Sequence, residues 1–377
     1  MTLRVLATSN VFEPGFRGGG PVRSLALLLD TIPPDIDLTL VTQDRDVNAT
    51  EPYPGLSGEW VRRGRADVFY LPVHDRRAWL SLWRRLRTTA FDVLYVNSLW
   101  SPVFTVVPVL ACRMRLVRAD HVVVAPRGEF SMGALAQKSW KKRPFAIVWG
   151  RLLKNMGATW HASTAREASE IRAVYPWARI RVALDQVALP AEPLPPLVDR
   201  EQPRFVFMSR IVPKKNLLTA IEALGRLPGQ VQLDVFGPME DAAYWQRCLR
   251  VIKETGTTDR VHYRGELPPS AVRQTFQRYD AFIFPTWGEN FGHVIAESLS
   301  ASCPVICSDQ TPWSAVLSAG GGAAIQNLSA GKLSAEIGRV MARSPAERLA
   351  ARHAAGAAYR AWHASHSNEN FLSTLTR

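Results

Sequence analysis

Short apolar runs alternate with longer stretches in which apolar residues recur every three or four positions. Such runs are typical of buried parallel strands, and the longer stretches of amphipathic helices that cover them. The first half predicts strands at 4–8, 37–42, 67–71, 93–97, 121–125 and 159–162, and helices at 21–30, 76–88, 102–114, 134–156 and 164–174. This alternation predicts an α/β domain with a parallel sheet.

The alternation stops at a proline-rich segment and then restarts. Residues 189–203 contain five prolines and show no periodicity, which indicates an inter-domain linker. Beyond it we expect strands at 205–208, 231–236, 260–263, 281–284 and 305–307, and helices at 217–227, 240–255, 268–279 and 330–362, with a further helix around 297.

We therefore predict an α/β chain of two Rossmann-like doubly wound domains facing each other across a cleft. The N-terminal domain covers 1–190, the linker 191–203 and the C-terminal domain 204–360, and the tail 361–377 can return to the N-terminal domain. Ligands of such sheets bind at the carboxyl ends of the strands.

The length and apolar content agree with this organisation and narrow the setting. A chain of 377 residues is too long for one ordinary core. No apolar run approaches the roughly 20 residues that cross a bilayer, and the start lacks a hydrophobic secretory segment, so we expect a cytoplasmic protein. The four scattered cysteines favour thiols packed in the core over disulfides or a metal site: Cys112, Cys248, Cys303 and Cys307.

The positive charge is concentrated in the first half. Residues 1–190 hold 26 Lys and Arg against 16 Asp and Glu, whereas residues 191–377 hold 20 against 17. A basic half suits an anionic partner, although arginine-rich helices that are merely solvated would give the same excess. Residues 76–88 and 134–156 combine basic residues with tryptophans, so they either lie against an anionic membrane surface or pack their aromatic face inward; we favour the membrane.

One segment, WGENFGHVIAESL at 287–299, carries the most specific chemistry. It places Glu289 in a loop after an apolar strand and Glu297 eight positions later, about two turns inside a helix. The N–H groups of Phe291, Gly292 and His293 would point out of the helix start, where a phosphate is favoured. The carboxylates can accept hydrogen bonds from sugar hydroxyls, and the backbone N–H groups can donate to a phosphate. This combination suits a sugar nucleotide as the ligand.

Two loops that follow predicted strands add basic and flexible residues. In VFMSRIVPKKN, Arg210 and Lys215 lie five positions apart across a proline turn, so both can reach a pyrophosphate unless they are simply solvated. The loop PGFRGGGP, with Gly19 and Gly20, lets backbone approach an anion at a helix start. It lacks the G-x-G-x-x-G register, which argues against a nicotinamide cofactor.

Other catalytic chemistries find little support. The D-x-D strings at 35–37 and 44–46 are short enough to arise by chance, so we expect no metal role for them. The eight histidines show no zinc spacing, and neither a G-x-S-x-G elbow nor a phosphate loop of the G-x-x-x-x-G-K type occurs.

Taken in order, the motifs resemble those of retaining glycosyltransferases of the GT-B fold, the family 4 class that builds bacterial polysaccharides. SRIVPKKN is similar to that family's Arg-x4-Lys loop, and GENFGHVIAES followed by PVICSD to its E-x7-E motif. FGP at 236–238 resembles a second glycine-rich turn, and FRGGGP the donor-facing glycine loop. DVLYVNSLWSP and VVVAPRGEFS resemble acceptor-side segments, so the resemblance covers nearly the whole chain.

The resemblance implies roles for individual residues. The implied catalytic set is Glu289, which holds hydroxyls of the transferred sugar, with Arg210 and Lys215 on the donor pyrophosphate. The implied donor-binding residues are Glu297 on the ribose, Phe291, Gly292, His293, Gly19, Gly20 and Gly237, with His262 and Arg264 near the base. The implied acceptor-side residues are Asn97, Arg127 and Glu129.

The resemblance also implies the reaction: metal-independent, cofactor-free transfer with retention from a UDP- or GDP-sugar. The acceptor would be a saccharide or polyprenyl-linked saccharide in capsule, exopolysaccharide or lipopolysaccharide assembly, and the enzyme would be cytoplasmic or peripheral on the inner membrane face. Alternatives are a sugar-nucleotide epimerase or a soluble-acceptor transferase of the same fold. A non-enzymatic basic membrane or nucleic-acid binder fits less well, and we expect no nucleic-acid partner.

Two positions depart from the family pattern. Many members carry a histidine where this chain has Asn97. If that histidine assists the acceptor, its role here would be filled by Arg127, Glu129 or another group. The usual Asn-Gly-Val turn before the linker reads Asp185-Gln186-Val187, which leaves the local hinge geometry open.

Overall fold

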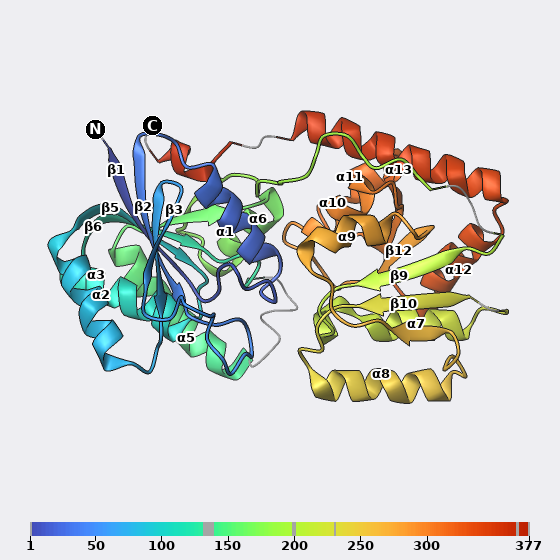
Figure 1. Cartoon of the computed structure of the whole chain (residues 1–377), viewed down its shortest axis with the longest axis horizontal. Helices are drawn as coiled ribbons and strands as arrows, with labels where there is room; N and C mark the ends of the chain where they lie inside the picture. The colour runs from blue at the N-terminus through green and yellow to red at the C-terminus, as the bar shows by residue number, and fades with distance from the viewer. Residues whose placement is uncertain (1, 131–138, 198–200, 230, 367–368, 376–377) are drawn as a thin grey trace. The chain divides into compact units, whose positions relative to one another are not determined.

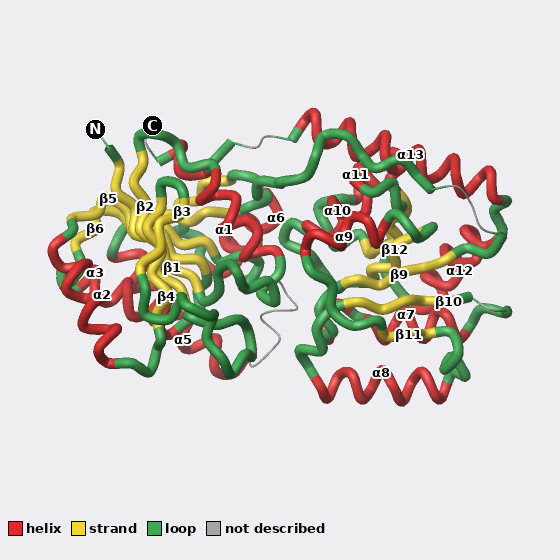
Figure 2. The backbone as a smooth tube through the Cα atoms, in the orientation of Figure 1, coloured by secondary structure: helices red, strands yellow, loops and turns green. Residues whose placement is uncertain are grey.

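The computed structural model describes residues 2–130, 139–197, 201–229, 231–366 and 369–375, with the side chains of 139–144 excepted. The chain forms two compact units. Unit 1 contains Met1–Val187 and Ser367–Arg377, and unit 2 contains Ala188–His366. Each unit is an α/β fold on a mainly parallel sheet, which confirms the predicted fold class (Figures 1 and 2).

The sheet of unit 1 has the order β3-β4-β2-β1-β5-β6-β7-β8. Its neighbouring strands are parallel except for the antiparallel pair β3 and β4. The strands are β1 (Leu3–Ser9), β2 (Ile36–Gln43), β3 (Trp60–Arg63), β4 (Ala66–Leu71), β5 (Ala90–Asn97), β6 (Arg118–Ala125), β7 (Thr159–Ala162) and β8 (Arg179–Val182).

Helices cover both faces of this sheet and complete two apolar cores. One core takes side chains from the helices that follow β4, β5, β6 and β7, and the other from α1 and the C-terminal 3-10 helix. The helices are α1 (Gly20–Asp30), α2 (Arg76–Thr88), α3 (Val107–Arg113) after a π-helical turn at Pro102–Val106, α5 (Ser139–Asn155), α6 (Ala165–Val174) and the 3-10 helix Phe371–Thr374.

Unit 2 has six parallel strands in the order β11-β10-β9-β12-β13-β14. This is the strand order of a dinucleotide-binding Rossmann sheet, with its switch point between the two central strands β9 and β12. The strands are β9 (Arg204–Met208), β10 (Gln232–Phe236), β11 (Val261–Tyr263), β12 (Ala281–Phe284), β13 (Val305–Ser308) and β14 (Gly322–Ile325).

The helices of unit 2 pack around this sheet and return the chain between its strands. They are α7 (Leu217–Gly225), α8 (Ala242–Glu254), α9 (Pro269–Phe276), α10 (His293–Ser300), α11 (Ser314–Val316), α12 (Ala330–Met341) and α13 (Pro345–Ser365), with a 3-10 turn at Pro213–Lys215 and a π-helical turn at Leu317–Gly321. No helix among the described residues is both long and apolar enough to cross a membrane.

The elements differ from the sequence-based expectations at a few places. The helix expected over 330–362 is two helices, because Ser344 caps α13 reciprocally with Glu347 and Pro345 occupies its first turn. Strands β3, β8 and β14 were not predicted. The largely exposed residues of β8 and the small residues of β14 leave no apolar strand pattern to detect.

The proline-rich segment is held against unit 2 by side chains that bond its backbone. Arg273 Nη2 donates to the carbonyl of Glu192 at 2.6 Å, and Ser302 Oγ donates to that of Leu194 at 2.6 Å. Buried Arg352 donates to the carbonyl of Leu197 at 3.0 Å. These carbonyls, which proline-rich backbone cannot satisfy through regular secondary structure, therefore have partners.

Candidate functional site

The loops after β9 and β12 lie side by side at the switch point of unit 2. Asn216 Nδ2 donates to the carbonyl of Pro285 at 2.9 Å, and the N–H of Trp287 donates to the carbonyl of Lys214 at 3.0 Å. Asn216 has a left-handed backbone with φ of 59°, a conformation that asparagine tolerates better than most residues. These bonds hold the basic loop and the Glu289 loop together where ligands of such sheets bind.

Lys215 and Glu289, 74 positions apart in the chain, form a buried ion pair. Lys215 Nζ lies 2.6 Å from Glu289 Oε1, and the two side chains are only 10% and 11% exposed. Thr286 Oγ1 also donates to Glu289 Oε1, at 2.8 Å. The structure thus brings two members of the predicted catalytic set into contact.

Burial and pairing shift the titration of both groups. Burial lowers the pKa of Lys215, and the charge of Glu289 opposes that effect. Burial alone would raise the pKa of Glu289, but the charges of Lys215 and Lys214 and the hydrogen bonds from Lys215 and Thr286 bring it below its ordinary value. Because an ammonium has three donors and a carboxylate two oxygens, the pair keeps capacity for a ligand. Among the described residues, Lys215 Nζ has the single hydrogen-bond acceptor Glu289, and Glu289 Oε2 has no hydrogen-bond donor.

The start of α10 has the form of an anion site. Its N-cap is Gly292 in a left-handed conformation with φ of 88°, and no side chain of the described residues caps the helix. Trp313 Nε1 donates to the carbonyl of Phe291 at 2.6 Å and so fixes the approach to the helix. A Cβ on Gly292 would lie 3.3 Å from that same indole nitrogen. The first N–H groups of α10 remain directed at whatever occupies this end.

Glu297 and His293 belong to the same helix. Glu297 is 8% exposed on the second turn of α10, as its spacing predicts, and His293 is half-buried in the first turn, with its ring 4.7 Å from that of Phe291. The predicted donor residues from 289 to 297 therefore lie on one loop and one helix end.

The other predicted residues of unit 2 lie on or after strands β9, β10 and β11, and two of them form ion pairs within the protein. Arg210 pairs with Glu240 at 2.9 Å, and Arg264 with Asp234 at 2.7 Å, while His262 is half-buried on β11. Gly237 has φ of 129°, and a Cβ there would lie 2.0 Å from the carbonyl oxygen of Ser209. Only glycine fits this close passage of the loops after β9 and β10.

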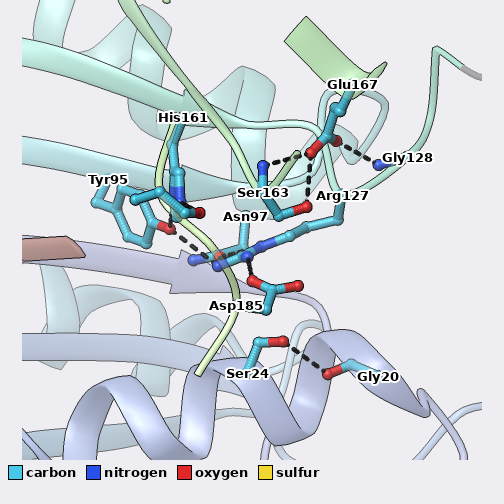
Figure 3. Close-up of polar contacts among 11 residues, drawn as sticks. Gly20, Ser24, Tyr95, Asn97, Arg127, Gly128, His161, Ser163, Glu167 and Asp185 are labelled. Carbon is cyan, nitrogen blue, oxygen red and sulfur yellow. Dashed lines mark hydrogen bonds and ion pairs between the residues drawn. The ribbon is translucent and has the colours of Figure 1, made fainter. Parts of the chain in front are cut away.

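In unit 1, the glycine loop after β1 leads into α1. Gly19, with φ of 69°, is the N-cap of α1, which no side chain of the described residues caps, and Gly20 is the first helical residue (Figure 3). Asp46 accepts hydrogen bonds from the backbone N–H groups of Phe16 and Arg17 at 3.0 and 3.2 Å. The second D-x-D string thus contributes a carboxylate that anchors this loop.

Figure 3 shows Arg127 inside a polar network at the carboxyl ends of β5, β6 and β7. Its guanidinium donates to Asn97 Oδ1 at 3.1 Å and to the Tyr95 hydroxyl at 2.9 Å, and it forms an ion pair with Asp185. The Tyr95 hydroxyl lies 2.8 Å from Nδ1 of His161. Three buried side chains therefore occupy most of the donors of Arg127.

Burial and the neighbouring charges set the protonation of this network. Burial lowers the pKa of His161 to about 3, with a further contribution from Arg127, so its ring is neutral at ordinary pH. Burial raises the pKa of Tyr95 to about 12. Although burial opposes it, the pKa of Arg127 is raised by Tyr95 and Asp185, so the guanidinium keeps its charge. The ring of Phe371 stacks on His161 at 3.7 Å between centroids and covers it from the C-terminal segment.

Two glutamates near this network accept hydrogen bonds from backbone N–H groups. Glu129 accepts from Ser98 Oγ at 2.8 Å and from the N–H of Leu99, and buried Glu167 accepts from the N–H groups of Gly128 and Ser163 at 2.6 and 2.8 Å. Sequence reasoning missed Tyr95, His161, Glu167 and Thr286, and assigned no role to Asp185, Asn216 or Trp313. A usable signal existed only for Asn216, which directly follows Lys215 in a turn that needs a left-handed residue.

Residues 195–357 match the family model described as glycosyl transferases group 1. A segment of 132 residues is 28% identical to the O-antigen chain mannosyltransferase B of Escherichia coli, and the match covers 32% of this chain and 33% of that protein.

Solved structures match over nearly the whole chain. Sucrose-phosphate synthase from Thermosynechococcus elongatus is similar with a TM-score of 0.73 at 16% identity, over 96% of each chain. Anabaena Alr3699/HepE, in complex with UDP and glucose, is similar with a TM-score of 0.71 at 16% identity, over 99% of each chain. The chain therefore has the two-domain α/β fold of the GT-B glycosyltransferases, and its region 195–357 matches a glycosyl transferases group 1 domain.

Proposed function

We propose that this protein is a glycosyltransferase that moves a sugar from a nucleoside-diphosphate sugar to a saccharide or lipid-linked saccharide acceptor. The match of residues 195–357 to glycosyl transferases group 1 supports the transfer chemistry. The similarity of one segment to an O-antigen mannosyltransferase supports a role in bacterial surface polysaccharide assembly, with capsule and exopolysaccharide as the related settings.

The observation that carries the proposal is the Lys215–Glu289 ion pair at the start of α10. Lys215 Nζ lies 2.6 Å from Glu289 Oε1, and among the described residues the remaining N–H donors of Lys215 and the second carboxylate oxygen of Glu289 have no hydrogen-bond partner. The uncapped start of α10 lies in the same loop as Glu289. Donors for a diphosphate and an acceptor for sugar hydroxyls are what a sugar nucleotide requires.

These groups suggest how the reaction proceeds. When the bond between the anomeric carbon and the diphosphate breaks, negative charge grows on the leaving oxygen and positive charge on the sugar ring. Lys215, Arg210 and the N–H groups of α10 would stabilise the leaving charge by preorganised electrostatics, and Glu289 would hold sugar hydroxyls. Arg210 would have to give up or share its contact with Glu240 to reach a phosphate.

Glu297, Phe291, His293, Gly237, His262 and Arg264 remain our predicted donor contacts in unit 2, and Gly19 and Gly20 those in unit 1. We infer a UDP- or GDP-sugar donor. We also propose family 4 chemistry with retention of the anomeric configuration, by attack on the same face within an ion pair. Analysis of the product anomer by NMR tests retention, and an inverted product would refute it.

A donor screen tests the proposal directly. Thermal shift with UDP, GDP, ADP, TDP and their sugars should show one nucleotide class that raises the melting temperature, because a ligand stabilises the state that binds it. Radiolabelled transfer from that donor into membrane extract should follow. Glu297→Ala should depress transfer and leave the protein folded. Donor turnover to an epimer without any acceptor would favour the epimerase alternative instead.

We further propose that transfer needs no metal ion, since cationic side chains and helix amides can carry the leaving charge. Turnover should therefore survive EDTA. Loss of activity in EDTA that Mg²⁺ or Mn²⁺ restores would contradict this and turn attention to Asp44 and Asp46. Because the proposed acceptor is lipid-linked, we place the enzyme at the cytoplasmic face of a membrane as a peripheral protein.

A further inference from the structure

Helices α2 and α3 of unit 1 expose large apolar side chains on their outer face. The two helices lie side by side (Figure 1) and line the same apolar cavity. Five large apolar side chains on or just after these helices are more than a third exposed: Leu80 at 57%, Val107 at 39%, Leu110 at 38%, Met114 at 61% and Leu116 at 41%. Val107, Leu110 and Met114 are spaced by three and four positions and so share one face of α3, and apolar side chains grouped on one exposed face are typical of an interaction surface.

The chain segment that carries these apolar side chains is rich in arginine. Residues 76–118 contain eight arginines and the single acidic residue Asp92, a net charge of +7 in a chain whose total is +13. Asp92 accepts a hydrogen bond from the N–H of Arg4 at 2.7 Å. Seven of these arginines are exposed and form no ion pair with any described residue: Arg76, Arg77, Arg84, Arg87, Arg113, Arg115 and Arg118. With the five exposed apolar residues they define what we call the α2–α3 face.

The cavity that α2 and α3 line together with strands β1, β2 and β4 is apolar. It has a volume of about 30 Å³, and Thr8 is its one polar lining residue. Trp83, Val103 and Val107, which line it, are half-buried or exposed at the surface. This space is too small for a sugar or a nucleotide, and its apolar walls suit the end of a hydrocarbon chain.

Two of the tryptophans in the segments predicted to contact a membrane, Trp79 and Trp149, pack into the protein instead, and the side chain of Trp140 lies outside the described residues. Trp149 of α5 is 4% exposed and stacks on Phe145, and half-buried Trp79 donates from Nε1 to the carbonyl of Val73. Residues 134–138 of the predicted segment 134–156 lie outside the described residues. Among the described residues of α5, the exposed ones are the aliphatic Ile147 and Val148, at 58% and 69%, and the polar Arg151, Lys154 and Asn155. Among the described side chains on or just after α2, α3 and α5, the large apolar residues that are exposed are therefore aliphatic residues and Met114.

We propose that the α2–α3 face docks unit 1 onto an anionic lipid bilayer. The apolar side chains of Leu80, Leu110 and Met114 would enter the headgroup region, and the unpaired arginines would contact lipid phosphates. An anionic bilayer fits because the face combines positive charge with apolar area, whereas a nucleic acid would gain nothing from the aliphatic side chains. The inference rests on the peripheral location in the proposed function and names the surface responsible.

Vesicle co-sedimentation of the full chain tests this face. The protein should bind vesicles of phosphatidylcholine with phosphatidylglycerol, release at high salt and bind phosphatidylcholine alone only weakly. Arg84→Gln with Arg87→Gln should lower the partition coefficient about 30-fold, since each basic residue near the surface contributes about a factor of five. Leu110→Gln with Met114→Gln should lower it about tenfold through lost apolar burial.

Helix α8 of unit 2 supplies matched controls, because it also carries exposed arginines and an exposed leucine. Arg247→Gln with Arg250→Gln removes the same charge as the double arginine variant of α2. Leu249→Gln is the control for the change at Leu110, because Leu249 is 40% exposed and Leu110 is 38% exposed. These variants should bind vesicles as the wild type does. An equal loss in the α8 variants would overturn the proposal, since binding would then follow overall charge.

Two further outcomes would also refute the α2–α3 face: unchanged binding in its own variants, or wild-type binding to RNA but not to anionic vesicles. Transfer to a soluble saccharide acceptor, measured in parallel, keeps this inference separate from the proposed function. If the wild type binds vesicles through this face but transfers no sugar, the activity proposal fails while the docking surface stands. If the wild type transfers sugar but does not bind anionic vesicles, the docking surface fails while the activity proposal stands.

Discussion

Each unit holds a buried ion pair near the carboxyl edge of its sheet, and the two pairs differ in how fully the protein satisfies them. The side chains of Arg127 and Asp185 in unit 1 are 8% and 7% exposed, and those of Lys215 and Glu289 in unit 2 are 10% and 11% exposed. The guanidinium of Arg127 donates hydrogen bonds to three protein side chains. Lys215 has the single hydrogen-bond acceptor Glu289 among the described residues.

Burial and charge alone therefore do not distinguish a ligand site from a structural network. The difference lies in the hydrogen-bonding capacity that remains after folding. In unit 1 nearly every N–H donor of Arg127 is hydrogen-bonded to a protein side chain. These bonds fix the loops after β5, β6 and β8. In unit 2 the unused groups of the pair lie in the same loop region as the uncapped start of α10. We infer that the first pair positions the backbone and the second binds the donor.

The largest expected effect is on transfer when Lys215 is lost. Lys215→Ala should reduce kcat/KM for the sugar nucleotide by about 10²–10³, because it removes a preorganised cation from the leaving phosphate. It should also lower the free energy of unfolding by about 3–5 kcal/mol, since Glu289 would be buried without a partner. Steady-state kinetics and chemical denaturation measure the two effects. Lys214→Ala, a change in the half-buried neighbour, is the control and should cost much less in both.

Arg127→Ala should affect stability without affecting donor binding. Loss of Arg127 leaves Asp185 buried and unpaired, so the free energy of unfolding should fall by about 3–5 kcal/mol. The affinity for the sugar nucleotide, measured by titration where the variant is folded, should stay within about twofold. Arg166→Ala, which removes an exposed pair with Glu170, should cost less than about 1 kcal/mol. Loss of donor affinity in Arg127→Ala would remove the contrast between the two pairs.

The pH dependence of stability should report on the unit 1 network through His161. The folded ring has a pKa of about 3, whereas an unfolded histidine titrates near 6.5. The unfolded state therefore binds more protons between these values, so stability is present above pH 6.5 and is lost as pH falls toward 3. The loss should reach about 2 kcal/mol at pH 5 relative to pH 7. Denaturation of His161→Gln should lack this component, and an equal pH dependence in both proteins would contradict the assignment.

The smallest effect tests the support of the α10 start. Trp313→Phe removes the hydrogen bond from Nε1 to the carbonyl of Phe291 and keeps an aromatic ring. Because one such bond contributes about 1 kcal/mol, the KM for the donor should rise about fivefold with little change in kcat. Trp245→Phe on α8 is the control. A fall in kcat at unchanged KM would place the role of Trp313 elsewhere.

Much of the fold followed from local patterns in the sequence. Apolar runs and helical periodicity predicted most of the strands and helices, because burial on both faces leaves a clear pattern. The limits of α2 at Arg76 and Thr88 were predicted as found. The break before α13 was missed although Ser344, Pro345 and Glu347 are the residues that cap a new helix, since strong helix formers on both sides outweighed them.

The candidate site was predictable only in part. The motifs marked Glu289, Glu297 and Lys215, and their spacing placed them near a helix start. Contacts between distant segments could not be predicted. They include the pair of Lys215 with Glu289 and the hydrogen bonds by which Thr286 and Trp313 support the loop. The network around Arg127 brings together β5, β6, β7 and the segment after β8, and no local pattern encodes such a meeting.

Calorimetric titration of the screened sugar nucleotide into Lys215→Met with Glu289→Leu tests the central claim most directly. Replacing both members of a buried pair by apolar residues of similar size should leave the free energy of unfolding within about 1–2 kcal/mol of the wild type. The account predicts a folded double variant with no measurable donor binding and no transfer. Wild-type donor affinity in that folded variant would contradict it.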